Sequence, residues 1–205
     1  MGNRYTYSGD TADCGEIMPD FIDIINNVHG FISLAEMQLL YDLAAQVPKG
    51  GNIVEIGAAQ GRSTLSLALG AKEAGAMVYS IDPHDTYTEK DTTFGMADNQ
   101  AYYSNLAHYN VGDVVRTINL PSMQSMTGWF SAIELLWIDG SHEYLDVRSD
   151  FEEWSTHVTR NGKIAFHDTA GFHIGVTQLV DEILAAGQWI RTQQVDAISV
   201  FERVK

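Results

Sequence analysis

Short apolar runs rich in β-branched residues alternate along this chain with segments of helical period, and no other feature restricts its fold as much. The apolar runs lie at residues 53–56, 77–81, 114–118, 133–138 and 163–166. Segments whose apolar residues recur at every third or fourth position lie between them, at residues 63–74, 98–109 and 142–158. Strands that alternate with helices are typical of a mostly parallel sheet with crossover helices. We therefore predict an α/β domain with helices on both faces of the sheet.

The flanking segments add a helix and a pair of strands to this pattern. Ser33 and Glu36 have the spacing of a capping box, and the apolar residues after them keep a helical period until Pro48. Near the other end, two further strand candidates lie at residues 188–192 and 197–201. The turn between them is too short for a crossover helix, so we predict a C-terminal antiparallel hairpin.

The first 30 residues show no sustained period and contain several helix-breaking residues. We interpret residues 1–30 as an extension that acts as a lid or as an interface between subunits, so a homo-oligomer is one expectation. Residues 31–205 are predicted to form one domain, which the length of 205 residues suits.

The chain is strongly acidic, with 27 Asp and Glu against 12 Lys and Arg and a formal net charge of -15. Such a field repels phosphate backbones and anionic lipids, so we expect no nucleic acid and no membrane as partners. The alternative interpretation of the charge is solubility alone. Cys14 has no second cysteine to pair with, and the N-terminus lacks the apolar stretch of a signal peptide. We therefore expect a cytoplasmic protein that acts on a small molecule.

The first predicted strand runs through a glycine-containing turn directly into a helix. Gly57 and Gly61 allow a tight turn, and the free N–H groups of the helix start can hold an anionic group. Glu55 is an acid inside an apolar strand, which is costly unless a donor such as an amine pairs with it. Asp82 follows the second strand, where acids of nucleotide-binding folds accept hydrogen bonds from ribose. A plain strand-to-helix turn is the alternative.

Two further acids lie at the ends of the fourth and fifth apolar runs: Asp139 directly follows the fourth, and Asp168 is the second residue after the fifth. Adjacent parallel strands end roughly 5 Å apart, so these carboxylates can converge on one point. They would repel each other unless a cation lies between them, and an oxygen-rich site suits Mg²⁺, Ca²⁺ or Mn²⁺. The alternative for each acid is a helix N-cap.

Histidines lie near the same strand ends. His142 comes three residues after Asp139, and an imidazole is a natural general base for a hydroxyl. His167 is interpreted as a packed strand residue, with metal ligation as the alternative. His84 either lines the cofactor loop or lies solvated in a turn. Trp137 is predicted to belong to the core.

In this order along the chain, these residues resemble the class I S-adenosylmethionine-dependent methyltransferases, most closely the macrocin-type (macrolide-sugar) O-methyltransferase group. The stretches that carry the resemblance are residues 54–64, 81–82, 138–144 and 162–168, together with Val147, Arg148 and Asp150. The resemblance implies a Rossmann-like, seven-stranded, mostly parallel sheet that binds S-adenosylmethionine.

The resemblance also implies roles for single residues. Those expected to hold the methionine part of the cofactor are Glu55, Gly57, Ala58, Ala59, Gly61 and Ser63. By similarity, Asp82 would take the ribose hydroxyls and Ser122 would lie near the adenine. Asp139 and Asp168 would bind a divalent metal such as Mg²⁺, and His142 would act as the base.

Two positions depart from the family pattern: Ala59 stands at the middle of the glycine motif, and His167 replaces a carboxylate of the macrolide-sugar enzymes. The expected function is transfer of a methyl group from S-adenosylmethionine to a hydroxyl of a sugar or diol-like molecule, with divalent-metal assistance. The alternatives are a nicotinamide-dependent oxidoreductase and a non-catalytic S-adenosylmethionine-binding protein. Irregular segments at residues 1–30, 85–99 and 170–173 would shape the acceptor pocket, so the sequence does not identify the acceptor.

Overall fold

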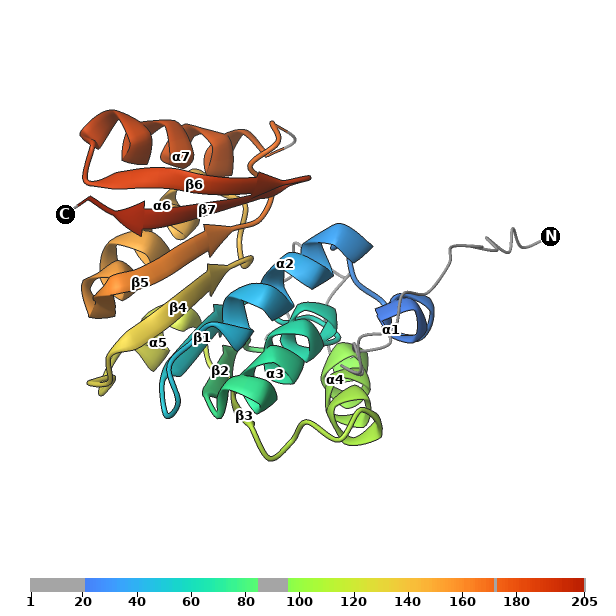
Figure 1. The fold of residues 1–205 in the computed structure, drawn as a ribbon. Helices are drawn as coiled ribbons and strands as arrows, with labels where there is room; N and C mark the ends of the chain where they lie inside the picture. Colours follow the sequence, from blue (N-terminus) through green and yellow to red (C-terminus); the bar gives the residue numbers. More distant parts are fainter. Residues whose placement is uncertain (1–20, 85–95, 172, 205) are drawn as a thin grey trace, which may run out of the picture.

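The computed structural model describes residues 21–84, 96–171 and 173–204, in which helices cover both faces of a seven-stranded sheet (Figure 1). The strands are β1 (Asn52–Ile56), β2 (Met77–Ile81), β3 (Val115–Ile118), β4 (Ile133–Ile138), β5 (Val158–Phe166), β6 (Trp189–Val195) and β7 (Ile198–Arg203). The helices are α1 (Phe21–Asn27), α2 (Leu34–Ala45), α3 (Arg62–Ala74), α4 (Met96–His108), α5 (Ser122–Ser125), α6 (Tyr144–Trp154) and α7 (Ile174–Ala186), with a 3-10 turn η1 (Ser155–His157).

The strand order is β3-β2-β1-β4-β5-β7-β6. Neighbours from β3 to β5 pair in parallel, whereas β7 lies antiparallel to both β5 and β6. The predicted α/β class, the mostly parallel sheet and the C-terminal hairpin are therefore confirmed. The chain order reverses between β1 and β4, and a ligand site is expected outside the carboxyl ends of the strands at such a point.

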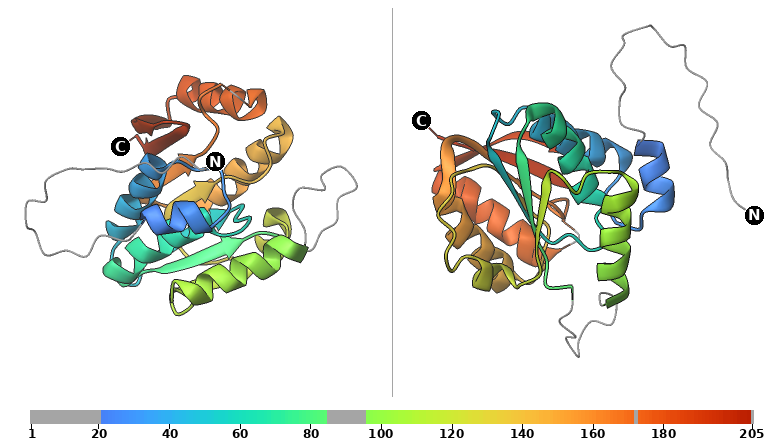
Figure 2. Two further views of the ribbon diagram at one scale, coloured as in Figure 1. Left: turned by 90° about the vertical axis from the view of Figure 1, so that its right-hand side faces the viewer. Right: turned by 90° about the horizontal axis from the view of Figure 1, so that it is seen from below.

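Helices lie against both faces of the sheet (Figure 2), and each face has its own apolar cluster. On one face, α2 and α3 contribute Met37, Leu40 and Leu65, which share a cluster with the fully buried Trp137 of β4. On the other face, Trp154 of α6 shares a cluster with residues of α7 and of the sheet. Apolar residues on both faces explain why the strands read as continuous apolar runs, and they confirm Trp137 as a core residue.

Three elements differ from the expectations. α2 begins after Ser33 with the capping box as predicted, but α1 precedes it where no element was expected. The segment predicted as one helix at residues 142–158 ends as α6 and η1, because Val158 pairs with Ile133 and starts β5. Val158 matched the helical stripe because it packs into the same apolar cluster. α5, a single turn after β3, was not expected either.

Part of the predicted extension belongs to the body of the fold. Phe21 and Ile24 of α1 are buried in the same cluster as α2. The interpretation of Cys14 and of the lid falls on residues 1–20, and most of the predicted pocket segment 85–99 falls on residues 85–95; both stretches lie outside the described residues. Among the described helices, none is long and apolar enough to cross a membrane.

Candidate active site

A cavity of about 850 Å³ opens at the carboxyl ends of the central strands. The sequence-predicted site residues that line it are Gly57, Ala58, Ala59, Ser63, Asp82, Ser122, Asp139, His142 and Asp168. Glu55 and Gly61 were also predicted to contact the cofactor, but they are not among the lining residues. The cavity therefore brings most of the predicted residues together, although they come from segments far apart in the sequence.

Backbone hydrogen bonds between neighbouring strands continue one residue beyond the strand ends, so that Gly57, Asp139 and His167 lie side by side. Gly57 donates its N–H to the Ile81 carbonyl at 2.9 Å, and Asp139 donates to Ile56 at 2.8 Å. His167 donates in turn to the carbonyl of Ile138 at 3.1 Å. Because the ladder holds through these residues, their side chains emerge at one edge of the sheet.

The turn after β1 depends on its backbone geometry. Gly57 has a φ of +87°, and a Cβ there would lie 2.1 Å from the carbonyl oxygen of Asp139. Ala59, where the family pattern has glycine, also adopts a positive φ of 46°. The loop therefore keeps a left-handed residue at this position despite the alanine side chain. Gly61, the N-cap residue of α3, has a φ of +92° and faces the ring of Tyr102 rather than the cavity.

Asp82 fastens this loop from the end of β2. Its Oδ2 accepts the N–H groups of Ala58 at 2.8 Å and Ala59 at 2.9 Å, and its Oδ1 accepts the N–H of His84 at 3.0 Å. His84 is buried, and its Nε2 lies 2.8 Å from the carbonyl oxygen of Ala59. The interpretation of His84 as a solvated turn residue is wrong, because it supports the loop from behind.

Glu55 lies beneath the loop, fully buried. Hydroxyl groups hydrogen-bond both of its carboxyl oxygens: Ser63 at 2.6 Å, Thr64 at 2.6 Å and Ser80 at 2.7 Å. Burial raises the pKa of Glu55 to about 7, although the three hydroxyls oppose the shift. The donors that sequence reasoning required are therefore hydroxyls of α3 and β2, and no cofactor amine is needed to satisfy this acid.

Ser122 of α5 lines the cavity together with Asp150 of α6, to which its hydroxyl donates a hydrogen bond. Asp150 is 5% exposed, and burial raises its pKa to about 6. Sequence reasoning did not assign Asp150 a role. Its signal was an acid on the apolar side of a helix, in the turn next to the buried Val147.

At the ends of β4 and β5, Asp139 and Asp168 both approach His167. The Nδ1 atom of His167 lies 3.3 Å from Asp139 Oδ1 and 3.3 Å from Asp168 Oδ2. Asp168 adopts a φ of +58°, a left-handed conformation that is strained for most side chains and common at functional sites. The N-cap alternative is wrong for both acids, because α6 follows Glu143 and α7 follows His173 as their capping residues.

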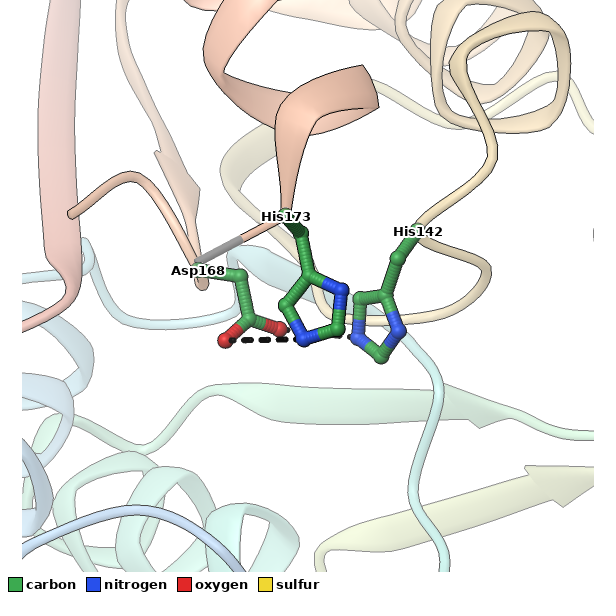
Figure 3. Close-up of side chains that lie close together, drawn as sticks. All are labelled: His142, Asp168 and His173. Carbon is green, nitrogen blue, oxygen red and sulfur yellow. Dashed lines mark ion pairs between the residues drawn. The ribbon is translucent and has the colours of Figure 1, made fainter. Parts of the chain in front are cut away.

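His142 and His173 stand over Asp168 at the mouth of the cavity (Figure 3). His142 Nε2 lies 2.8 Å from Asp168 Oδ2, and His173 Nε2 lies 3.9 Å from Asp168 Oδ1. The two imidazole rings stack with their centroids 3.9 Å apart. The sequence analysis assigned His173 no role, since its distance to Asp168 depends on the turn between β5 and α7.

The histidines and carboxylates of this cluster shift one another's pKa values. The hydrogen bond to Asp168 raises the pKa of His142 above its usual value, against the effect of burial. Burial favours neutral Asp168, but its contacts with His142 and His167 outweigh burial and hold the pKa far below its usual range. Burial raises the pKa of Asp139, and His167 offsets part of that shift. Burial also opposes a charge on His167, yet the surrounding carboxylates raise its pKa to about 12.

One wall of the cavity comes from the connection between α1 and α2, of which sequence reasoning expected only the part up to residue 30 to shape the pocket. Residues 29–32 line the cavity. The guanidinium of Arg62 donates to the carbonyls of Val28 at 2.6 and 2.9 Å and of Ile32 at 3.1 Å. Arg62 therefore ties this wall to the start of α3.

Comparison with known proteins gives a family match over the site. A family model described as a methyltransferase domain matches residues 54–169, more than half of the chain. Among curated proteins, the uncharacterized protein y4gI of Sinorhizobium fredii is 44% identical over 39 residues, 19% of this chain. That match spans only 4% of the length of y4gI.

Solved structures share the fold over most of the chain. One is an O-methyltransferase from Bacillus cereus in complex with SAH, with 18% identity, coverage of 91% of this chain and 93% of that chain, and a TM-score of 0.67. Another is the O-methyltransferase TomG of Streptomyces achromogenes, involved in tomaymycin synthesis and in complex with SAM (15% identity, 85% and 82% coverage, TM-score 0.65). A third is an rRNA methylase from Streptococcus thermophilus (11% identity, 86% and 100% coverage, TM-score 0.62). Proteins named for different acceptors thus share this fold.

Proposed function

Because this chain belongs to the family of this methyltransferase domain, we propose that it transfers the methyl group of S-adenosylmethionine to a hydroxyl of a small polar molecule. A sugar or a diol-like compound is the proposed acceptor class. The observation that carries the proposal is that one cavity is lined both by a nucleotide-type loop and by a cluster of histidines and carboxylates. The first can hold the methyl donor, and the second can activate a hydroxyl.

In the part of the cavity next to the turn after β1, where the cofactor would bind, Asp82 has room to accept one more hydrogen bond. Each carboxylate oxygen can accept two hydrogen bonds. The two N–H groups of the loop fill the capacity of Oδ2, whereas the N–H of His84 is the one hydrogen bond that Oδ1 accepts from the described residues. Asp82 Oδ1 can therefore take a ribose hydroxyl without loss of the loop's own hydrogen bonds. Ser122 and Asp150 would then face the adenine end, and the turn from Gly57 to Ser63 the methionine end.

In the part of the cavity around Asp168, where the acceptor would bind, His142 would act as the general base. Its Nε2 points at Asp168, so a neutral His142 donates from Nε2 and keeps Nδ1 free to accept a proton. Asp168 is the positioning residue, since it fixes this tautomer and stabilises the imidazolium that forms. Methyl transfer is an in-line displacement, and much of the acceleration comes from holding donor and acceptor in attack geometry. The acceptor oxygen would attack the sulfonium methyl as its proton passes to His142.

The residues around Asp168 fit a divalent cation. One imidazole nitrogen and two carboxylates present ligand atoms within 4.8 Å of one another, in Asp139, His167 and Asp168. A cation bound there would lower the pKa of an acceptor hydroxyl and orient a second acceptor oxygen. Asp139 and Asp168 would hold it next to His142. A homo-oligomeric state and a cytoplasmic location stay predictions.

Calorimetric titration tests the cofactor assignment. We expect the protein to bind S-adenosylhomocysteine and not NAD, and Asp82→Asn to weaken that affinity by roughly tenfold or more, since a hydrogen bond to a charged group is lost. Asp113→Asn is the matched control, because it removes the same charge from an exposed carboxylate that pairs with Lys72. Binding of NAD alone would establish the oxidoreductase alternative instead.

Transfer of a labelled methyl group from S-adenosylmethionine to a panel of sugars and catechols tests the reaction. We expect incorporation into a hydroxyl of at least one panel member. Cofactor binding with no transfer to any member would favour the non-catalytic alternative.

A further inference from the structure

His167 occupies an unusual position for a packed strand residue. It is 6% exposed, and its two ring nitrogens face carboxylates on opposite sides. Nδ1 lies 3.3 Å from both Asp139 Oδ1 and Asp168 Oδ2, while Nε2 lies 3.5 Å from Oε1 of Glu36. Nε2 is buried and makes no hydrogen bond among the described residues. A buried imidazole thus lies among three acids without a close partner on either side.

The distances at Nδ1 are those of neighbouring ligands rather than of a hydrogen bond. A charge-assisted N–H···O bond spans about 2.7–2.9 Å, shorter than either contact. Donor atoms about 2.1 Å from one ion and separated by 90° to 109° lie about 3.0–3.4 Å from each other. Both contacts of Nδ1 fall in that interval. The two distances from Nδ1 therefore suit ligands of one ion, and ligand atoms of all three residues lie within 4.8 Å of one another.

Glu36 stands where a partner for a ligating histidine is needed. Its Oε2 accepts the N–H of Ser33 at 2.7 Å, and its Oε1 accepts the N–H of Ala197 at 2.8 Å. These bonds fix a 2% exposed carboxylate on the Nε2 side of His167. Metal-bound histidines generally donate their second N–H to such an outer carboxylate or carbonyl, which fixes the tautomer. A cation that displaces the proton of Nδ1 would leave the other proton on Nε2, facing Glu36, and the lone pair of Nδ1 facing Asp139 and Asp168.

We propose that His167 is the nitrogen ligand of the cation site, with Asp139 and Asp168 as oxygen ligands and Glu36 as the outer partner that sets the tautomer. This assignment rests on the cation site of the proposed function. Imidazole suits Zn²⁺, Fe²⁺ and other first-row transition ions, whereas Mg²⁺ prefers oxygen ligands. The site therefore selects a transition ion such as Mn²⁺, Fe²⁺, Co²⁺ or Zn²⁺ over Mg²⁺.

The experiment measures metal binding directly, on the full chain freed of metal. Calorimetry with Co²⁺ and with Mg²⁺ gives the selectivity, and pulsed electron paramagnetic resonance of the Mn²⁺-loaded protein reports any coordinated histidine nitrogen. We expect Co²⁺ to bind at least about tenfold more tightly than Mg²⁺. His167→Glu should abolish the nitrogen coupling and reduce the Co²⁺ preference, because the site then offers only oxygen ligands. Glu36→Gln should weaken Co²⁺ binding by roughly tenfold to a hundredfold.

His173→Ala is the matched control, because His173 also contacts Asp168 but lies outside the assigned ligand set. It should leave the nitrogen coupling and the selectivity unchanged. His142, Asp168 and His173 form a second group whose ligand atoms lie within 4.8 Å of one another. A nitrogen coupling that survives in His167→Glu but disappears in His173→Ala or His142→Ala would overturn the assignment in favour of this second group. Equal affinity for Mg²⁺ and Co²⁺, or no binding of Co²⁺ and Mn²⁺, would also overturn it.

Titration with S-adenosylhomocysteine in the same samples separates the two proposals. If the wild-type protein does not bind S-adenosylhomocysteine, the proposed function is contradicted. If it binds S-adenosylhomocysteine but no transition metal, only the assignment of His167 is contradicted.

Discussion

The buried carboxyl of Glu55 predicts a measurable dependence of stability on pH. Its pKa is raised from 4.5 to about 7 in the folded chain, because burial disfavours the charged form more than the hydroxyls of Ser63, Thr64 and Ser80 favour it. A carboxyl group whose pKa is higher in the folded chain than in the unfolded chain binds its proton more tightly in the folded chain. The stability it contributes is therefore present at low pH and is lost as pH rises through about 7.

The size of the effect follows from the shift. One pKa unit corresponds to about 1.4 kcal/mol, so the shift of Glu55 is worth roughly 3 kcal/mol once both states are ionised. Between pH 5.5 and pH 8.5, about 2 kcal/mol of that loss should occur. Glu55→Gln removes the titration and keeps the shape, and the hydroxyls can rotate to donate to or accept from the amide.

Urea unfolding of the wild type and Glu55→Gln at several pH values across this range is the assay. Other titrating groups contribute equally to both proteins, so the difference in unfolding free energy isolates Glu55. We expect this difference to shift in favour of Glu55→Gln by about 2 kcal/mol from pH 5.5 to pH 8.5. A difference that stays constant across the range would refute the reasoning. Glu134→Gln is the control, because it makes the same change at another carboxyl, which accepts the backbone N–H of Asn52 at a partly buried site.

Further substitutions test the site and the loop. His142→Ala should lower the methyl-transfer rate by roughly a hundredfold or more while the affinity for S-adenosylhomocysteine stays unchanged, and full activity would contradict its role as base. Gly57→Ala should destabilise the fold by at least about 2 kcal/mol in thermal or urea unfolding, because its Cβ would collide with the carbonyl of Asp139 and its φ is positive. Gly112→Ala, whose Cβ meets nothing within 4 Å, should be nearly neutral. Similar stabilities of the two alanine variants would show that the close approach at Gly57 is unimportant.

Local patterns in the sequence were sufficient for most of the fold. The predicted runs at residues 77–81 and 133–138 coincide with β2 and β4, because strands buried on both faces are continuous apolar runs. The capping box of Ser33 and Glu36 located the start of α2, since it depends on residues three positions apart. α1 was missed because its seven residues are too few for a visible period, and its stability comes from burial against α2.

The sequence by itself determined which residues follow each strand, and a parallel sheet brings those residues to one edge whatever the loops do. Asp82, Asp139, His142 and Asp168 could be placed at one site for that reason. Only the tertiary structure decided what surrounds each side chain. Glu55 is satisfied by hydroxyls from α3 and β2.

The role of His167 is the sharpest case. In the sequence it directly follows an apolar run, and we interpreted it as a packed strand residue, with metal ligation as the alternative. Its contact with Glu36 joins positions 131 residues apart, and its contact with Asp139 spans 28. No local pattern encodes such distances, because they depend on how α2, β4 and β5 pack together. Chain order therefore gave the location of the site, and packing gave the chemical environment of its groups.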